Sequence, residues 1–546
     1  MYISNGDLTA QLSLFITISL LFLLYAEVHY RLKGLWSRLY QAEPEIVADT
    51  PHRLEPGARL PVLLLVKDAQ HFPIVLQNLS VNVKNKHTEA EFSFDVSGIR
   101  IDKNIWSRVF EMDLPAALAG QSWINVFVKY TVAGEQRQIR NDNYKWTSHD
   151  PLYLNISKDP LPRRQGWYYG DFHYHSDFTS DQVEFGAPLF ATTQIARAMG
   201  LDFFCATDHS YDLDDKPDDY LTADPDLKKW HNFRRQVHNH NADNADFIII
   251  PGEEVSIGNG NNKNVHLLVL NHDKFLPGSG DGAEKWLHMK PELNVGTLLS
   301  NLDNGTLTYA AHPEIKPPIL ERWLVGRDKW LSGDYRYRNL KGLQIWNGCD
   351  NGFLPGKTIW CDLLLQGTKL FIIAGNDAHG NFGRFRQIAF PFISMREHYD
   401  HLFGKIRTAV CLKQGDDFSL PNLMQAVHEG RMVITNGPFV DMSVVTQTGQ
   451  KAEIGGEVKS NQCVLNLKSI STPEYGALTR LIVYQGDVTT RKENKIAELQ
   501  NFNTAFEHEL KLAVASKAPL SYLRAELYST FGKCFTNPIW MDTKSV

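Results

Sequence analysis

The sequence predicts an α/β protein in which a seven-stranded (β/α)7 barrel lies between N-terminal and C-terminal β-sandwich-like domains and follows an N-terminal transmembrane helix. Three observations lead to this prediction. They are an uncharged apolar stretch near the start, an apolar periodicity that changes along the chain, and a series of strand-like runs separated by helical stretches. The length of 546 residues suits three or four domains.

Composition and charge exclude several classes of protein. The net charge is -6, from 56 Lys and Arg against 62 Asp and Glu, so no basic excess is available for phosphates and no nucleic-acid partner is expected. With 43% hydrophobic and 22% charged residues, the chain is neither mainly disordered nor a multi-span membrane protein. The six cysteines include no C-x-x-C pair, which argues against a disulfide framework and a thiolate zinc site.

The first predicted element is a membrane anchor at residues 8–26. This stretch carries no charge, and as a helix it spans about 28 Å, close to the hydrocarbon thickness of a bilayer. No Lys or Arg precedes it and no A-x-A-like site follows, so an uncleaved anchor is favoured over a signal peptide or a buried helix. Arg31, Lys33 and Arg38 lie in a juxtamembrane linker at 27–58 and favour the cytoplasmic side for the rest of a single-pass membrane protein.

Three further domains follow the linker. Residues 59–157 contain short β-branched and aromatic runs between polar turns, which predicts a β-sandwich. Residues 166–415 alternate apolar strands with helical stretches, which predicts the barrel, and 431–546 return to a β-rich pattern after a helix near 420–429. The seven predicted barrel strands are 167–172, 202–207, 247–251, 265–270, 307–311, 343–346 and 369–374.

Histidines and acids gather where these predicted strands end. His173 and His175 project the same way from the first strand, because side chains alternate with period two. Other strands end in Thr-Asp-His, in Ala-His-Pro and in Asn-Asp-Ala-His, at the carboxyl ends where barrel enzymes build their sites. The residues concerned are Asp208, His209, His312, Asp377 and His379.

A predicted hairpin adds two more ligand candidates. If its turn is centred on Gly260, Glu254 and His266 face each other with Cβ atoms about 5 Å apart, near enough to bridge metals. Asp181 lies in a polar loop over the same mouth. A lone His-x-His or Asp-x-His is more often structural, but clusters at so many strand ends predict a polynuclear metal centre. Asp208 either caps a turn or orients a neighbouring ligand.

Two arginines follow the last of these motifs. Arg384 and Arg386 are either solvated charges or contacts for an anionic substrate, and the sequence alone leaves both readings open.

The ordered set GDFHYHS, ATDHS, PGEEVS with a following His266, AAHPE and GNDAHG resembles the PHP (polymerase and histidinol phosphatase) superfamily. Within it, the chain is similar to the branch typified by the carbaryl hydrolases, and the tract AVHEGRMVITNGP at 426–438 looks like the exit from the barrel in that branch. The likeness covers about 167–390. It implies a distorted seven-stranded barrel that holds up to three metal ions.

The resemblance also implies which residues share each ion. His173, His175, Glu254 and Asp377 would hold one ion, and Glu254, His266 and His312 a second. Asp181, His209 and His379 would hold the third. Many members place an acid where this chain has Ser180, which makes Asp181 and the third ion the least secure assignment, and the G-x-E pattern of the family favours Glu254 over Glu253.

The expected function is a metal-dependent hydrolase that uses a metal-bridging hydroxide, with two to three divalent ions of zinc, manganese or iron. The leading hypothesis is a phosphoesterase for a small phosphorylated ester. His379 is a candidate general acid, and Asp208 is a second candidate catalytic residue. A carboxylester or carbamate hydrolase on the same centre is the alternative, for which Phe178, Trp346 or Phe353 would supply an apolar wall. A membrane-tethered binding module with a structural metal site is the third hypothesis.

Overall fold

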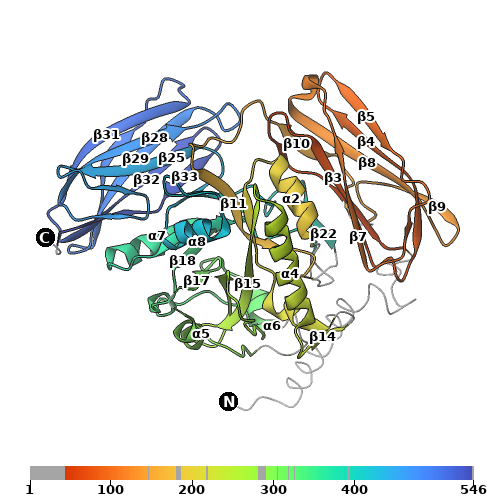
Figure 1. Ribbon diagram of the computed structural model, residues 1–546, viewed down its shortest axis with the longest axis horizontal. Coiled ribbons are helices and arrows are strands. Elements are labelled where there is room, and N and C mark those ends of the chain that lie inside the picture. The colour runs from red at the N-terminus through yellow and green to blue at the C-terminus, as the bar shows by residue number, and fades with distance from the viewer. Residues whose placement is uncertain are drawn as a thin grey trace, which may run out of the picture.

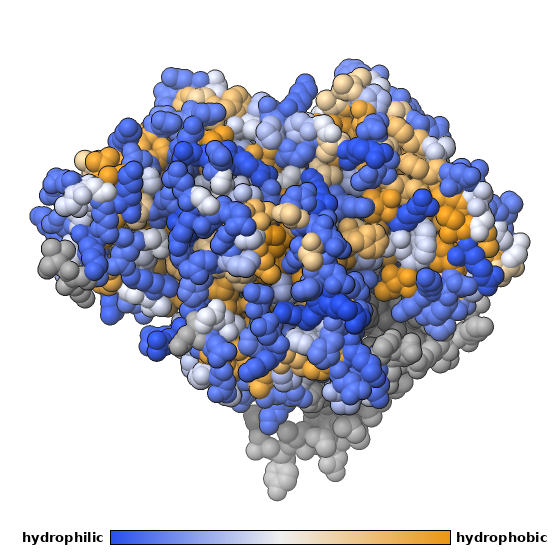
Figure 2. All heavy atoms as spheres, in the orientation of Figure 1, coloured by the Kyte–Doolittle hydropathy of each residue, from blue (hydrophilic) through white to orange (hydrophobic). Residues whose placement is uncertain are grey.

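The computed structural model describes residues 43–543, except 145–146, 180–185, 217–218, 281–289, 304, 318, 325 and 390–393. The described residues form three regions: an N-terminal pair of sheets, a C-terminal β-rich lobe, and a mixed α/β region between and below them (Figure 1). Strands make up far more of this chain than helices do. The face of the molecule in Figure 2 is largely hydrophilic, and hydrophobic residues gather most visibly over the N-terminal sheets.

The N-terminal region is antiparallel apart from one short parallel pair. A three-stranded sheet has the order β1 (Glu45–Asp49), β3 (Leu60–Lys67), β7 (Ile105–Met112). The second sheet has the order β2 (Arg53–Leu54), β10 (Leu152–Ile156), β8 (Gly120–Val132), β4 (Ile74–Lys84), β5 (Glu89–Phe94), with β6 (Arg100–Ile101) on β4 and β9 (Glu135–Arg140) on β8. Buried and more exposed positions alternate along β8, as expected for a strand with one face on a core. Strands β1 and β2 therefore fall inside the stretch predicted to be linker.

The middle region contains strands at all seven predicted stretches. They are β11 (Trp167–His175), β12 (Phe203–Ala206), β15 (Ile248–Gly258), β16 (Asn264–Leu270), β17 (Leu307–Ala310), β18 (Gly342–Asn347) and β19 (Phe371–Gly375). The helices between them are α2 (Leu189–Ala198), α3 (Ser210–Leu213), α4 (Lys228–Asp243), α5 (Val295–Asn301), α6 (Ile319–Leu324) and α7 (Phe353–Leu365). Short elements complete the region: η2 (Asp334–Arg336), β13 (Asp215–Lys216), β14 (Asp219–Ala223), β20 (Ala378–His379), β21 (Phe385–Ala389) and β22 (Ser394–His398); a further short helix, η1 (Ala116–Leu118), belongs to the N-terminal region.

The predicted (β/α)7 barrel, and with it the PHP-type fold, is wrong. Strand β16 follows β15 through a hairpin with no helix and pairs antiparallel with both β15 and β17. On the other side, β11 pairs antiparallel with β23 (Arg407–Cys411), so the sheet continues from the middle region into the C-terminal lobe. A β/α barrel requires each strand to be parallel to the next and joined to it by a crossover. The observed arrangement is one long mixed sheet instead.

The C-terminal lobe is built around the far end of that sheet. Helix α8 (Leu420–His428) leads into β24 (Met432–Thr435), which pairs with both β23 and β33 (Lys533–Thr536). The sheet goes on through β32 (Leu520–Ser529), β29 (Leu478–Asp487) and β30 (Lys492–Leu499), with β34 (Ile539–Asp542) and β27 (Glu457–Val458) beside it. A second sheet has the order β26 (Lys451–Glu453), β25 (Phe439–Thr446), β28 (Gln462–Ile470), β31 (Glu507–Ala515). Side chains of both sheets share one buried cluster.

The expected single-pass membrane localisation is also contradicted. Among the helices of the described residues, none is long and apolar enough to cross a membrane. The predicted anchor at 8–26 lies outside the described residues, as does the linker up to residue 42.

Candidate metal centre

The site forms where strands that run in one direction end together. Strands β11, β12 and β15 are parallel, and β17, β18 and β19 share their direction because β16 reverses the chain twice. After β19 the chain returns to β11: Asp377 donates its N–H to the carbonyl of His173 (2.8 Å), and β20 pairs with β11. A Cβ on Gly375 would lie 2.6 Å from the backbone N of His173, so only glycine allows this approach.

His173 and His175 project from β11 into a fully buried space, while Phe172 and Tyr174 between and beside them pack in apolar clusters on the other side. Nδ1 of His173 lies 2.8 Å from Oε1 of Gln344. The amide of Gln344 is itself oriented, because its Nε2 donates to Oδ1 of Asn347 (2.8 Å). An amide oxygen accepts, so Nδ1 of His173 carries the proton and Nε2 presents a lone pair to the cluster.

Glu254 lies at the centre of five imidazoles. Its Oε2 is 3.2, 3.3 and 3.1 Å from ring nitrogens of His173, His175 and His209, and its Oε1 is 2.8 Å from Nδ1 of His266 and 3.3 Å from Nε2 of His312. Asp377 Oδ1 is 3.3 and 3.2 Å from Nε2 of His173 and His175. The Nε2 atoms of these two histidines are only 3.0 Å apart. Nitrogen lone pairs therefore converge on the carboxylates from several strands.

Three overlapping groups in this space have the donor set of divalent metal sites. They are His173–His175–Glu254–Asp377, Glu254–His266–His312, and His175–His209–His379, with the ligand atoms within 4.8 Å of one another in each. Imidazole nitrogen with carboxylate oxygen, and no thiolate, suits zinc, manganese or iron. Two imidazole nitrogens 3.0 Å apart are close enough to share one cation. The residues present thus fit the expected two to three ions.

The electrostatics of the metal-free site follow from this crowding. Burial opposes the charged form of Glu254, but the imidazoles of His266 and His173 outweigh it and hold the pKa of Glu254 well below its usual range. For His173, burial is outweighed by Glu254 and Asp377, which raise the pKa of the imidazole to about 9, and the same carboxylates raise the pKa of His175 to about 9. Burial and the neighbouring His175 lower the pKa of His209 to about 4.

Two of the ligand candidates sit on strained backbone. His312 has φ 33° and Asp377 has φ 52°, in the left-handed region that residues with a Cβ rarely adopt. Each such residue costs about 1–2 kcal/mol, and such outliers cluster at functional sites. The conformations direct both side chains toward Glu254 and the histidines of β11.

An open cavity of about 310 Å³ gives access to the cluster. His266, His312 and Asp377 form part of its wall, so ligand atoms reach the cavity surface. Two cationic side chains, Lys316 and Arg327, line the same cavity, together with the amides of Asn347 and Asn351. Apolar atoms come from Pro313, Ile315, Pro317 and Trp330. None of these cationic or apolar residues follows a sequence pattern that would have marked it as part of a site.

A cysteine and a histidine also meet at this cavity. Cys349 Sγ lies 3.9 Å from Nε2 of His401, and Nδ1 of His401 lies 2.9 Å from the carbonyl of Asn376. The interaction with His401 lowers the pKa of the Cys349 thiol, and burial of His401 is outweighed by Cys349 and Asp377, which raise its pKa. The two residues are far apart along the chain, and no sequence pattern pairs them.

Other predicted residues lie next to the cluster or away from it. Asp208 is buried and accepts from the N–H and hydroxyl of Ser176 (both 2.8 Å) and from the N–H of Thr179 (2.9 Å), whose hydroxyl is 3.3 Å from Nδ1 of His175. It therefore fixes the turn that orients a ligand and does not reach the cavity. His379 stacks on His175 with ring centroids 4.1 Å apart. Asp181 lies outside the described residues.

The hairpin register differs from the predicted one. Glu254 pairs with Leu268 and His266 with Ser256, so the turn is shifted by one residue and the strands by two. A shift of two preserves the face on which a side chain lies, and Glu254 and His266 still meet diagonally at 2.8 Å. Glu253 points away and accepts from the indole N–H of Trp230 (2.8 Å), which separates it from the cluster.

The two arginines have partners of their own. Arg384 pairs with Glu397 (3.0 Å) and donates to the carbonyls of Asp150 and Pro151, and Arg386 lies 3.3 Å from Asp142 and 3.6 Å from Asp49. They join the middle region to the N-terminal sheets. The sequence left open whether they are solvated charges or contacts for a substrate anion, and in the structure both are buried and paired within the protein. The predicted apolar wall is elsewhere too, because Phe178 packs on Phe233 and Trp346 and Phe353 pack on Phe535.

Comparisons with known proteins identify no family. No family model matches the chain, and no curated protein matches it. Among solved structures, a DUF3823 family protein from Bacteroides ovatus is 12% identical over 29% of this chain and 82% of that chain, with a TM-score of 0.14. A putative β-galactosidase from Bacteroides fragilis is 9% identical over 93% and 74%, with a TM-score of 0.18. Bacteroides uniformis β-glucuronidase 2 is 8% identical over 93% and 62%, with a TM-score of 0.20. Scores this low bear on neither fold nor function.

Proposed function

We propose that this protein is a metal-dependent hydrolase of small phosphoesters. The observation that carries the proposal is the convergence of six imidazoles and two carboxylates, in three overlapping ligand groups, beside an open cavity that is also lined by two cationic side chains. Structural metal sites are closed, whereas hydrolytic sites keep a position open to substrate. Ligand atoms exposed to a cavity of about 310 Å³ favour a catalytic role over a structural one.

Divalent ions bound here would lower the pKa of a coordinated water and neutralise charge on the attacked group. The chain supplies the rest. Glu254 belongs to two of the ligand groups, so it would be shared by two of the ions. Gln344 keeps the proton of His173 on Nδ1, and Thr179 and Asp208 fix the position of His175, so that both Nε2 atoms stay directed at the ligand cluster.

Charge at the cavity wall favours a phosphoryl group over a neutral ester. A phosphate monoester needs cationic partners beyond the metals, and Arg327 and Lys316 provide them. A guanidinium presents paired N–H groups to two oxygens of one phosphoryl group, which orients the ester as well as neutralising it. Asn347 and Asn351 add amide donors.

A second candidate is hydrolysis of a carboxylester or carbamate on the same centre. The observation that favours it is the apolar part of the cavity wall, formed by Pro313, Ile315, Pro317 and Trp330. These side chains would accept an aryl or alkyl group without the help of Arg327.

The test is metal content and substrate preference measured on one preparation. Protein is stripped with a chelator, reloaded separately with manganese, zinc and iron(II), and assayed with p-nitrophenyl phosphate, bis-p-nitrophenyl phosphate, 1-naphthyl acetate and 1-naphthyl methylcarbamate. We expect two to three bound ions and metal-dependent turnover of a phosphoester, reduced at least tenfold by Arg327→Ala. Turnover of the naphthyl esters alone, unaffected by Arg327→Ala, would establish the second candidate. Failure to bind any of the ions would overturn both.

A further inference from the structure

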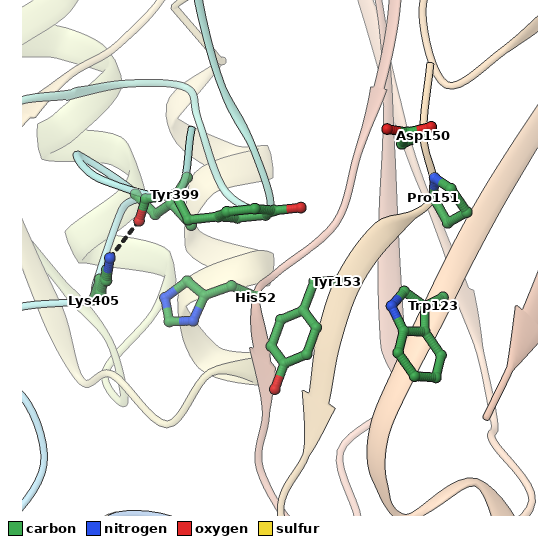
Figure 3. Close-up of a pocket in the computed structure, with 8 residues that line it drawn as sticks. His52, Trp123, Asp150, Pro151, Tyr153, Tyr399 and Lys405 are labelled. Carbon is green, nitrogen blue, oxygen red and sulfur yellow. Dashed lines mark hydrogen bonds between the residues drawn. The ribbon is translucent and has the colours of Figure 1, made fainter. Parts of the chain in front are cut away.

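A second pocket, separate from the metal cavity, lies between the N-terminal sheets and a loop of the middle region. Its volume is about 530 Å³, within the range of small-molecule sites. Figure 3 shows Tyr399 and His52 on one side, Trp123 on the other and Tyr153 between them. Asp150, Pro151, Leu402 and Lys405 complete the lining.

Two of the aromatic residues form a platform on one sheet. Trp123 of β8 and Tyr153 of β10 are directly opposite each other in the antiparallel register, so their side chains lie side by side on the same face. This is the outward face, because the flanking residues Ser122 and Ile124 are buried. Trp123 is 36% exposed. An outward position on a half-buried sheet normally carries a polar residue, and the core does not explain a tryptophan there.

A third aromatic residue faces the platform from the middle region. Tyr399, 49% exposed, belongs to the loop between β22 and β23, and the carbonyl of Tyr399 accepts from Nζ of Lys405. The loop is anchored at its other end, where Gly404 donates its N–H to Asp171 (2.9 Å) and Phe403 donates to the carbonyl of Asn381 (2.9 Å). The pocket is therefore a slot with the Trp123–Tyr153 platform on one side and Tyr399, on an anchored loop, on the other.

The polar groups of the slot carry little net charge. Lys405 is paired with Asp400 (3.3 Å), and the exposed carboxylate of Asp150 supplies a negative charge nearby. Burial, and next to it the charge of Arg407, lowers the pKa of His52 to about 3, so its imidazole is neutral. Nε2 of His52 is buried and has no hydrogen-bond partner among the residues that the structure describes. The charged groups of Asp150 and Lys405 can exchange hydrogen bonds with hydroxyls, but they offer no surplus of cations for an anion.

We propose that this slot binds an uncharged sugar ring. A pyranose has apolar C–H faces, which match the Trp123–Tyr153 platform with Tyr399 across from it, and a rim of hydroxyls, which match Asp150 and Lys405. A purely apolar ligand would leave those polar groups desolvated without partners, and a phosphorylated one would meet Asp150. The site is independent of the metal centre and of the hydrolysis proposed for it.

The experiment is saturation-transfer NMR on the metal-free full chain, with glucose, galactose, mannose and cellobiose as probes and p-cresol as an uncharged planar comparator. We expect transfer to the ring protons of at least one sugar. Trp123→Ala and Tyr399→Ala, each checked for an unchanged thermal unfolding midpoint, should each weaken that binding at least tenfold. Trp323→Ala is the matched control, because Trp323 is 84% exposed on α6 and does not line the slot.

Three outcomes would overturn the proposal. They are no transfer to any of the sugars, transfer that survives both aromatic substitutions, and transfer to p-cresol alone. Because metal is absent throughout, failure here leaves the hydrolase proposal untouched, and a protein that binds no metal can still bind the sugar.

Discussion

Among the buried clusters of charged and titratable side chains in the described residues, the one around Arg386 and the one around Glu254 are built differently. In the arginine cluster, Arg386 faces Asp49 and Asp142, and Asp49 also accepts from the N–H groups of Phe382 (3.0 Å) and Gly383 (3.0 Å). Each carboxylate there meets a donor that always carries its proton. In the histidine cluster, five imidazoles surround Glu254, and Nε2 of His173 and His175 face each other at 3.0 Å.

The difference separates an ion-pair network from a ligand set. Arginine cannot give up its proton in a protein, so a guanidinium beside a carboxylate satisfies both charges without a further ligand. Imidazoles crowded around one carboxylate can exchange their protons for a metal ion. The first cluster therefore holds two regions of the chain together, and the second has the donor set of the proposed metal site. Each of the following predictions tests one side of this contrast.

The largest effect is expected from Glu254→Gln. The amide keeps the size of the side chain but removes the charge that two of the ligand groups share. We expect loss of bound metal and a loss of activity beyond the 10- to 100-fold typical of changes in outer-shell partners, because Glu254 is itself a ligand candidate. Metal content by elemental analysis, alongside phosphoester turnover, measures both.

Glu253→Gln is the matched control, one residue away on the opposite face of β15. Burial raises the pKa of Glu253 to about 7, and its carboxylate accepts from Trp230 and not from the histidines. Metal content should stay at the level of the unchanged protein. Equal loss of metal in the two variants would mean that the cluster is held by general packing and not by Glu254.

A substitution in the arginine cluster should lower the stability of the protein without changing its metal content. Arg386→Met keeps much of the length of the side chain but leaves Asp49 and Asp142 buried without their partner. Breaking a buried pair in this way costs about 3–5 kcal/mol. We expect a lower urea midpoint with the metal stoichiometry of the folded protein unchanged. A loss of metal at unchanged stability would instead place Arg386 in the functional site.

The next prediction concerns pH. Without metal, His173 and His175 have pKa values of about 9, above the ordinary 6.5, so both bind protons at neutral pH that a metal ion must displace. Apparent metal affinity should rise with pH from 7 to 9 by about tenfold per unit for each proton displaced, and then level off. Calorimetry in buffers of different ionisation enthalpy counts the protons released.

The stability of the metal-free protein should change in the opposite direction. A raised histidine pKa stabilises the folded state fully below the unfolded value of 6.5, and this contribution is lost as the pH rises toward 9. The thermal unfolding midpoint of the stripped protein should therefore fall over this pH range, while the midpoint of the metal-loaded protein changes little. A flat profile for both forms would argue against the coupling of His173 to Glu254 and Asp377.

Local patterns in the sequence located the strands and much of the candidate site. The alternation in Asp-Phe-His-Tyr-His places His173 and His175 on one face of any sheet to which they belong. Glu254 and His266 stay on the same face of the hairpin although the register is shifted, because the shift is by two residues. The direction of β16 and the pairing of β11 with β23 were mispredicted, because they depend on partners far along the chain. A family resemblance carried by strand-end motifs says nothing of those pairings.

The residues that line the cavity were missed for a related reason. Lys316 and Arg327 lie in an irregular stretch between β17 and β18, where no periodicity marks a side chain as facing a site. Arg384 and Arg386 follow a ligand motif closely, and this proximity in sequence suggested contact with a substrate anion. In the structure Arg384 pairs with Glu397 and bonds to carbonyls of the N-terminal region, and Arg386 pairs with Asp142 of that region. The charge of a residue does not tell whether it lines a cavity or forms an ion pair inside the protein, because the residues that would pair with it come from elsewhere in the chain.

The smallest of these effects is expected from Gln344→Leu, which leaves every ligand candidate in place. The substitution removes the acceptor for Nδ1 of His173 and breaks the chain of amides that runs through Asn347 to Asp377 (3.1 Å). The imidazole is then free to hold its proton on Nε2, so metal affinity should fall by about 10- to 100-fold while the protein stays folded. Gln344→Glu restores an acceptor at the same position and should recover most of the affinity. Equal weakening by both variants would show that Gln344 acts through packing and not through the tautomer of His173.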